Sequence, residues 1–238
     1  MSIMRRETYL FCGLTIATNM ISAGGYAQTP EDYMKQYTNE QAIITDISEK
    51  LTIVNRAGKL SAYSEVNKEK LLIGQQSPAL FNTEYIFHSY FNKLEDHTEE
   101  ALVPSAKGYK RIKRTSVKTQ HSEQNNIFYD DARQTEIAFD WLAPGALLRT
   151  GYTVSHTDVH MLPAYYFQEN LRVAKSVYEV TVPKSVEVQF VLKGADVDKV
   201  VRNRKEGKND ITYTFTAQNL SSYRDLDDAP SLAWHALH

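Results

Sequence analysis

The sequence contains one cluster of metal-ligand type, His156-Thr157-Asp158-Val159-His160. Residues i, i+2 and i+4 of an extended strand point to one side, so His156, Asp158 and His160 could converge on a metal ion. Two imidazoles and a carboxylate suit zinc or copper. The cluster lacks the glutamate of the helical zinc-protease motif, and it lies where a strand should give way to a loop before Pro163. Two interpretations therefore stay open, metal-assisted hydrolysis and a solvated strand end.

A second candidate site is aromatic and consists of Trp141, Tyr165 and Tyr166. Aromatic side chains offer a large contact area at low entropic cost, so these three could form a platform for sugar rings or a peptide. Aromatic runs in β-sandwiches more often enter the core. A carbohydrate-binding module is therefore one hypothesis, and core packing is its alternative.

Three aspartates near the end of the sequence, Asp225, Asp227 and Asp228, carry the oxygen ligands that calcium prefers. They lack the glycine and glutamate of a calcium-binding helical loop, so a solvated linker is the expected role. The sequence also has no glycine-rich phosphate loop and no nucleophile motif that places Ser beside His. We therefore expect no cofactor and no enzymatic activity.

The first 27 residues have the layout of a secretory signal peptide. Arg5 and Arg6 precede a mostly apolar run at 9–21, and Gly25-Tyr26-Ala27 fits a small-x-small cleavage site. The run is too short and too polar to cross a bilayer, which takes about 20 apolar residues. We expect cleavage after Ala27 and export to the periplasm or the cell surface, with a buried N-terminal helix as the alternative.

Cleavage after Ala27 would remove Cys12, the only cysteine of the sequence. The remaining chain could form no disulfide, no thiolate metal site and no cysteine nucleophile. Because Arg5, Arg6 and Glu7 would also leave, the 27 basic and 29 acidic side chains become 25 and 28, a net charge of −3. This balance argues against nucleic acid as a general partner.

Strand patterns dominate residues 28–220, after a short helix that Thr29-Pro30 predicts near the start. Apolar and polar residues alternate at 176–182, 186–192 and 211–216, and turn residues such as Asn55 to Lys59 separate the candidate strands. An acidic stretch at 94–103 and a basic one at 107–118 could pair as a hairpin. The sequence thus predicts a large antiparallel β-sandwich, with residues 221–238 as a tail or linker.

One group of motifs suggests a family. Leu142-Ala143-Pro144-Gly145 leads into a strand with Tyr152; Tyr166-Phe167-Gln168 follows, and Val177 to Pro183 reads Val-Tyr-Glu-Val-Thr-Val-Pro. Tyr213-Thr214-Phe215 and Asn219-Leu220 then precede an acidic, Pro-containing tail. On these motifs the chain resembles the exported bacterial domain of unknown function that lies N-terminal to transglutaminase-like domains.

The resemblance implies a β-sandwich that acts as an accessory module without an activity of its own. Its expected partner is a transglutaminase-like domain, another envelope protein or a glycan. Transglutaminase-type chemistry needs a cysteine nucleophile, and residues 28–238 contain no cysteine. The expectation is therefore a non-catalytic binding module, either a stand-alone copy or a piece of a longer protein.

Overall fold

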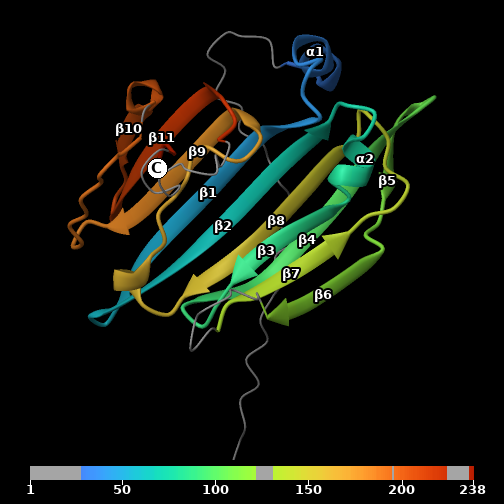
Figure 1. The fold of residues 1–238 in the computed structure, drawn as a ribbon. Helices are drawn as coiled ribbons and strands as arrows, with labels where there is room; N and C mark the ends of the chain where they lie inside the picture. Colours follow the sequence, from blue (N-terminus) through green and yellow to red (C-terminus); the bar gives the residue numbers. More distant parts are fainter. Residues whose placement is uncertain (1–27, 122–130, 195, 224–235) are drawn as a thin grey trace, which may run out of the picture.

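The computed structural model describes residues 28–121, 131–194, 196–223 and 236–238. In this part of the chain, eleven strands form two sheets, which can be followed in Figure 1. The predicted signal peptide and the three aspartates Asp225, Asp227 and Asp228 lie outside the described residues. Among the helices that the structure describes, none is long and apolar enough to cross a membrane.

The larger sheet has eight strands in the order β10-β11-β9-β1-β2-β8-β4-β5. Its neighbouring strands are antiparallel except for β1 and β9, which run parallel. The strands are β1 (Ala42–Arg56), β2 (Lys59–Leu72), β4 (Asn92–Ser105), β5 (Gly108–Ile112), β8 (Leu147–His156), β9 (Arg172–Pro183), β10 (Val201–Glu206) and β11 (Asp210–Leu220).

The smaller sheet has three antiparallel strands in the order β3-β7-β6 and lies in front of the β8 and β4 half of the larger sheet (Figure 1). Between the two sheets, Ile86 and Ile137 pack with Ala101 and Leu148 in one buried cluster. The predicted β-sandwich is therefore confirmed. The three strands are β3 (Thr83–His88), β6 (Ser116–His121) and β7 (Arg133–Ala138).

The predicted N-terminal helix is confirmed as α1 (Pro30–Gln36). Thr29 Oγ1 accepts the Asp32 N–H at 3.2 Å, and the Asp32 carboxylate accepts the Thr29 N–H at 3.0 Å, which completes a capping box. Tyr33 and Met34 pack against a small buried cluster around Leu71. A second helical turn, α2 (Ser77–Leu80), precedes β3.

The acidic and basic stretches form the predicted hairpin of β4 and β5. Arg111 Nε lies 2.8 Å from Glu100 Oε2 across the two strands. Arg114, between β5 and β6, forms an ion pair with Glu99, whose side chain is fully buried. The basic stretch continues into β6 of the smaller sheet, so its basic side chains lie on strands of both sheets.

The β1, β9 and β11 half of the larger sheet is covered by connecting segments instead of strands. One of these is 186–192, for which the prediction of a strand was wrong, because the segment joins no ladder. Its alternation reflects burial alone: Phe190 and Leu192 pack against the sheet while Glu187 and Gln189 are exposed. The stretch at 197–204 begins as a 3-10 turn, and β10 starts only at Val201.

The final residues also contribute to this cover. Ala236 and Leu237 are fully buried, and the Phe167 N–H donates to the Leu237 carbonyl at 2.9 Å. Lys193 and His238 exchange two backbone hydrogen bonds of 2.9 and 3.1 Å. The predicted boundary at residue 220 stays a prediction, because 224–235 lie outside the described residues.

Candidate functional site

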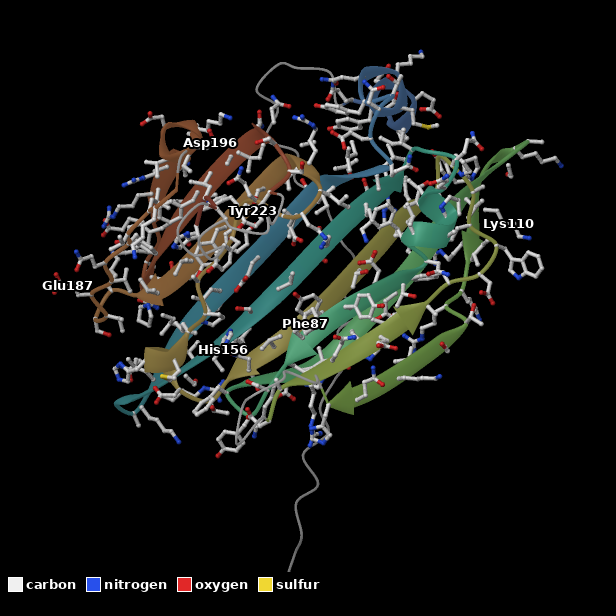
Figure 2. All side chains as sticks on the ribbon, viewed as in Figure 1. Phe87, Lys110, His156, Glu187, Asp196 and Tyr223 are labelled. Atoms are coloured by element: carbon white, nitrogen blue, oxygen red, sulfur yellow. The ribbon has the colours of Figure 1, made fainter. Side chains whose placement is uncertain are left out.

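The structure places His156 at the end of β8, where its side chain is buried (Figure 2). Its Nε2 lies 2.8 Å from Ser64 Oγ, and its Nδ1 lies 2.8 Å from Asn92 Oδ1. Burial lowers the pKa of the imidazole below its ordinary value of 6.5. With both nitrogens in protein contacts, neither is directed at a ligand.

The other two residues of the predicted metal cluster do not join His156. Asp158 caps the 3-10 turn Val159–Met161, and its Oδ1 accepts the His160 N–H at 2.8 Å. The His160 side chain is exposed. Within the described ranges, no three His, Cys, Asp or Glu side chains are grouped so as to hold a metal. The strand-end interpretation of this cluster therefore fits the structure better than the metal site.

A polar network that the sequence did not indicate surrounds His156. Ser64 on β2 donates its hydroxyl to Glu49 Oε1 at 2.6 Å, and Asn92 lies on the far side of the imidazole. Ser, His and Asn in this order match a nucleophile, a base and an orienting group. However, Ser64 is only 2% exposed, so its hydroxyl is not accessible to a substrate. The network therefore serves as a buried link between β1, β2, β8 and β4.

The lowered pKa of His156 predicts a loss of stability in mild acid. Between about pH 7 and pH 5 the unfolded chain takes up a proton that the buried imidazole resists, so the free energy of unfolding falls as pH falls. Urea unfolding across this range should give a flatter slope for His156→Gln than for the wild type. Burial also lowers the pKa of His88, so part of the pH dependence of stability should remain in both proteins. Equal slopes would contradict a buried neutral His156.

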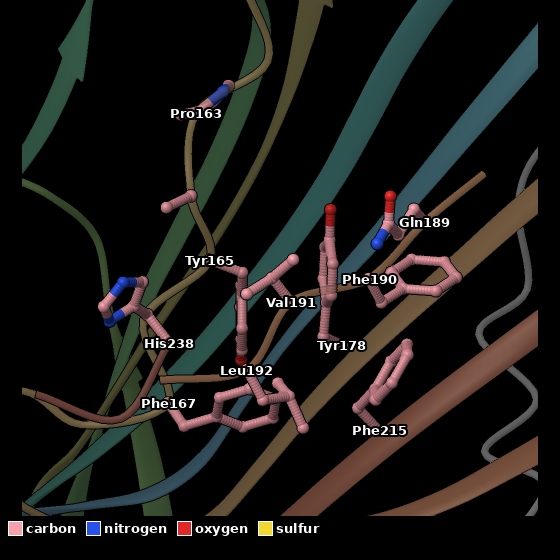
Figure 3. Close-up of a pocket in the computed structure, with 11 residues that line it drawn as sticks. Pro163, Tyr165, Phe167, Tyr178, Gln189, Phe190, Val191, Leu192, Phe215 and His238 are labelled. Carbon is pink, nitrogen blue, oxygen red and sulfur yellow. The ribbon is translucent and has the colours of Figure 1, made fainter. Parts of the chain in front are cut away.

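A cavity of about 240 Å³ opens over β9 and β11, beneath the covering segments (Figure 3). Tyr165 and Tyr178 stack at 4.6 Å between ring centroids with an interplanar angle of 7°, and Phe190 lies 4.9 Å from Phe215. Tyr165 Oη lies 2.9 Å from Ser176 Oγ. The lining residues are Pro163, Ala164, Tyr165, Phe167, Tyr178, Gln189, Phe190, Val191, Leu192, Phe215 and His238.

Burial also acts on the two stacked tyrosines, raising the pKa of Tyr165 and of Tyr178. Both phenols therefore stay neutral at ordinary pH. Most of the lining side chains are aliphatic or aromatic, and Gln189 and His238 are polar side chains among them. Such a lining takes up an apolar group of a ligand and fixes it with few hydrogen bonds.

The three predicted aromatic site residues do not share one surface. Tyr165 lies in the pocket wall, while Tyr166 is half-buried with its ring 5.1 Å from the His238 ring. Trp141 is 86% exposed, lies in the loop between β7 and β8, and does not line the pocket. The carbohydrate platform stays a prediction, and Trp141 is its accessible member.

Sequence reasoning found Tyr165 but missed most of the pocket. Phe190 and Leu192 carried a usable signal, since their alternation with polar residues showed that the segment has a buried face. Tyr178 and Phe215 lie in the alternating stretches 176–182 and 211–216, which form parts of β9 and β11 as predicted. Tyr178 and Phe215 are opposite each other in the antiparallel β9–β11 pairing, and the segment with Phe190 and Leu192 packs over them. Local patterns encode neither contact.

The model of DUF3857, described as a domain of unknown function with a solved structure, matches residues 80–224. No curated protein matches the sequence. The crystal structure of a "putative protease" from Parabacteroides distasonis is 15% identical with a TM-score of 0.63, and the match covers 83% of this chain and 39% of that one. At this identity the similarity shows the fold alone.

Two further solved structures are more distant. An M1 zinc metallopeptidase from Deinococcus radiodurans is 13% identical with a TM-score of 0.38, over 75% of this chain and 39% of that chain. A "putative nutrient binding protein" from Legionella pneumophila is 9% identical with a TM-score of 0.37, over 78% and 65%. These scores carry no functional argument. The chain spans about two fifths of the length of the protease and metallopeptidase structures.

Proposed function

The chain belongs to the DUF3857 family, whose function is unknown, and on this premise we propose that it is a non-catalytic binding module. Two observations support the proposal. Residues 28–238 contain no cysteine, and Ser64, whose hydroxyl lies beside His156, is only 2% exposed. The positive support is the aromatic pocket, which offers recognition without a reactive group.

The ligand that best fits this pocket is an apolar side chain of a partner polypeptide. A volume of about 240 Å³ lies below the 300–1,000 Å³ of drug-sized ligand sites, so it holds one large side chain or a single ring. A sugar would need several directed hydrogen bonds, while Tyr165 Oη is already engaged with Ser176. Apolar side chains that enter such pockets are frequent anchors of protein interfaces.

The partner we propose is a transglutaminase-like domain or another protein of the cell envelope. The support is the resemblance carried by Tyr166-Phe167-Gln168 and by 177–183, together with the signal-peptide layout of residues 1–27. The similar Parabacteroides structure is more than twice as long as the region matched. A neighbouring domain of a longer chain would satisfy the proposal as well as a separate protein.

A plug in the pocket mouth tests the proposal. Val191 lines the pocket and is 64% exposed, so Val191→Trp should occupy the mouth without disturbing the core. Envelope proteins captured by residues 28–238 would be identified by mass spectrometry, and each purified candidate titrated against wild type and variant. We expect at least about tenfold weaker binding by Val191→Trp, equivalent to 1.4 kcal/mol.

The matched control is Val201→Trp, which places the same ring on β10 at a site that is 69% exposed and outside the pocket lining. It should bind like the wild type. Equal binding by all three proteins would show that the pocket is not the site. A folded wild type that captures no partner would overturn the binding-module proposal.

A further inference from the structure

Strand β3 forms one edge of the smaller sheet, and no strand among the described residues pairs with its outer side. The Phe139 N–H donates to the Asn82 carbonyl at 2.8 Å, in register with the β3–β7 ladder. Because hydrogen-bonded pairs alternate along an antiparallel ladder, residues 84, 86 and 88 bond to β7. The backbone N–H and C=O groups of Thr83, Tyr85 and Phe87 therefore point away from β7, toward the open edge.

The edge of β3 lacks the protection that the other edges carry. Exposed edge strands normally contain charged residues, especially Lys, that discourage pairing with another chain. Lys110 and Arg111 lie on β5, and β10 carries Arg202, Arg204 and Lys205. β6 has Lys118. The sequence of β3 is Thr-Glu-Tyr-Ile-Phe-His, and its only carboxylate, Glu84, turns inward to a buried ion pair with Lys70.

The outer face of β3 is also aromatic. Tyr85 and Phe87 are 51% and 65% exposed, and Figure 2 shows Phe87 on the outer surface of the smaller sheet. Tyr90 and Phe91 follow in the next turn, pack edge to face at 5.5 Å and are also exposed. Four large rings thus lie along and just beyond a strand whose outer edge pairs with no other described strand.

We infer that β3 receives an extended segment of a partner polypeptide, which adds to the smaller sheet as a fourth strand. Only another extended backbone offers alternating N–H and C=O groups at the spacing of Thr83, Tyr85 and Phe87. Because the edge carries no outward charge, the added strand is uncharged, with β-branched or aromatic residues that pack beside Tyr85 and Phe87. The inference rests on the proposed binding role and assigns it a second site, separate from the pocket.

The probe is a random ten-residue peptide library, selected on the protein covering residues 28–238. The strongest peptide is then synthesised twice, once unmodified and once N-methylated at alternate residues. We expect alternating β-branched or aromatic sequences, slower amide exchange at Tyr85 and Phe87 on binding, and at least tenfold weaker binding of the methylated peptide. A selection without enriched sequences, or equal binding of both peptides, would overturn the inference.

Proline variants give the matched comparison. Tyr85→Pro removes an N–H that points away from β7, so the ladder survives while the donor for the added strand is lost. Val117→Pro places the same ring on β6, the opposite edge of the same sheet. We expect Tyr85→Pro to weaken peptide binding at least tenfold and Val117→Pro to leave it unchanged, with both melting temperatures near that of the wild type.

Two other outcomes identify a different occupant. If Val191→Trp abolishes peptide binding and Tyr85→Pro does not, the peptide sits in the pocket: the edge inference fails and the proposed function survives. If the wild type is dimeric in light scattering and Tyr85→Pro is monomeric, a second copy of the chain occupies β3, and the partner-strand inference fails. Binding that resists both substitutions overturns both assignments.

Discussion

Lys70→Met is expected to lower the free energy of unfolding by about 3–5 kcal/mol, because it leaves Glu84 buried without its cation. The two side chains are only 9% and 7% exposed. Lys70 lies on β2 and Glu84 on β3, so their ion pair joins the two sheets. The Lys70 ammonium also lies 5.3 Å from the centre of the Phe81 ring, an additional favourable contact that the substitution removes.

Urea unfolding of three variants separates burial from charge. Lys70→Met combined with Glu84→Leu should recover most of the loss, because a buried ion pair can be replaced by apolar side chains at little cost. Lys175→Met is the control: its pair with Asp46 is 49% and 43% exposed, and the same substitution there should cost no more than about 1 kcal/mol. A Lys70→Met protein as stable as the control would show that Glu84 finds water or another donor.

The elements that the sequence predicted correctly are those whose signals are local. The turn at Asn55 to Lys59 forms as expected, with Ala57 and Gly58 at φ of 53° and 86° and Asn55 Oδ1 accepting the Gly58 N–H. The helix cap at Thr29 and the alternating strand at 211–216 are likewise encoded in a few neighbouring residues. The signal for each of these features lies in residues that are only a few positions apart in the sequence.

The features that local patterns did not reveal depend on contacts between distant segments. Alternation at 186–192 reported a buried face correctly, but a buried face does not specify whether a neighbouring strand accepts the backbone hydrogen bonds. The metal interpretation of His156, Asp158 and His160 required a strand that continued past residue 156, whereas β8 ends there, as in the strand-end interpretation. The buried position of Ser64 beside His156 depends on the pairing of β2 with β8, which no local sequence motif predicts.

Phe167→Ala is expected to lower the free energy of unfolding by about 3–5 kcal/mol, the usual cost of emptying a large buried aromatic site. Phe167 is 1% exposed, its ring lies 4.9 Å from that of Tyr165, and its N–H donates to Leu237. The next residue, Gln168, accepts the Leu237 N–H with its side chain at 2.8 Å. The Tyr-Phe-Gln motif thus anchors the pocket wall and the final residues together.

Urea unfolding of Phe167→Ala, with Phe87→Ala as the control, measures whether the pocket wall belongs to the cooperative core. Phe87 is 65% exposed, so its removal should change stability by no more than about 0.5 kcal/mol. A loss near 4 kcal/mol at Phe167 would mean that the pocket is held in shape before any ligand arrives. A loss below about 1 kcal/mol would mean that the wall opens without unfolding the sheet, and that binding at the pocket must first order it.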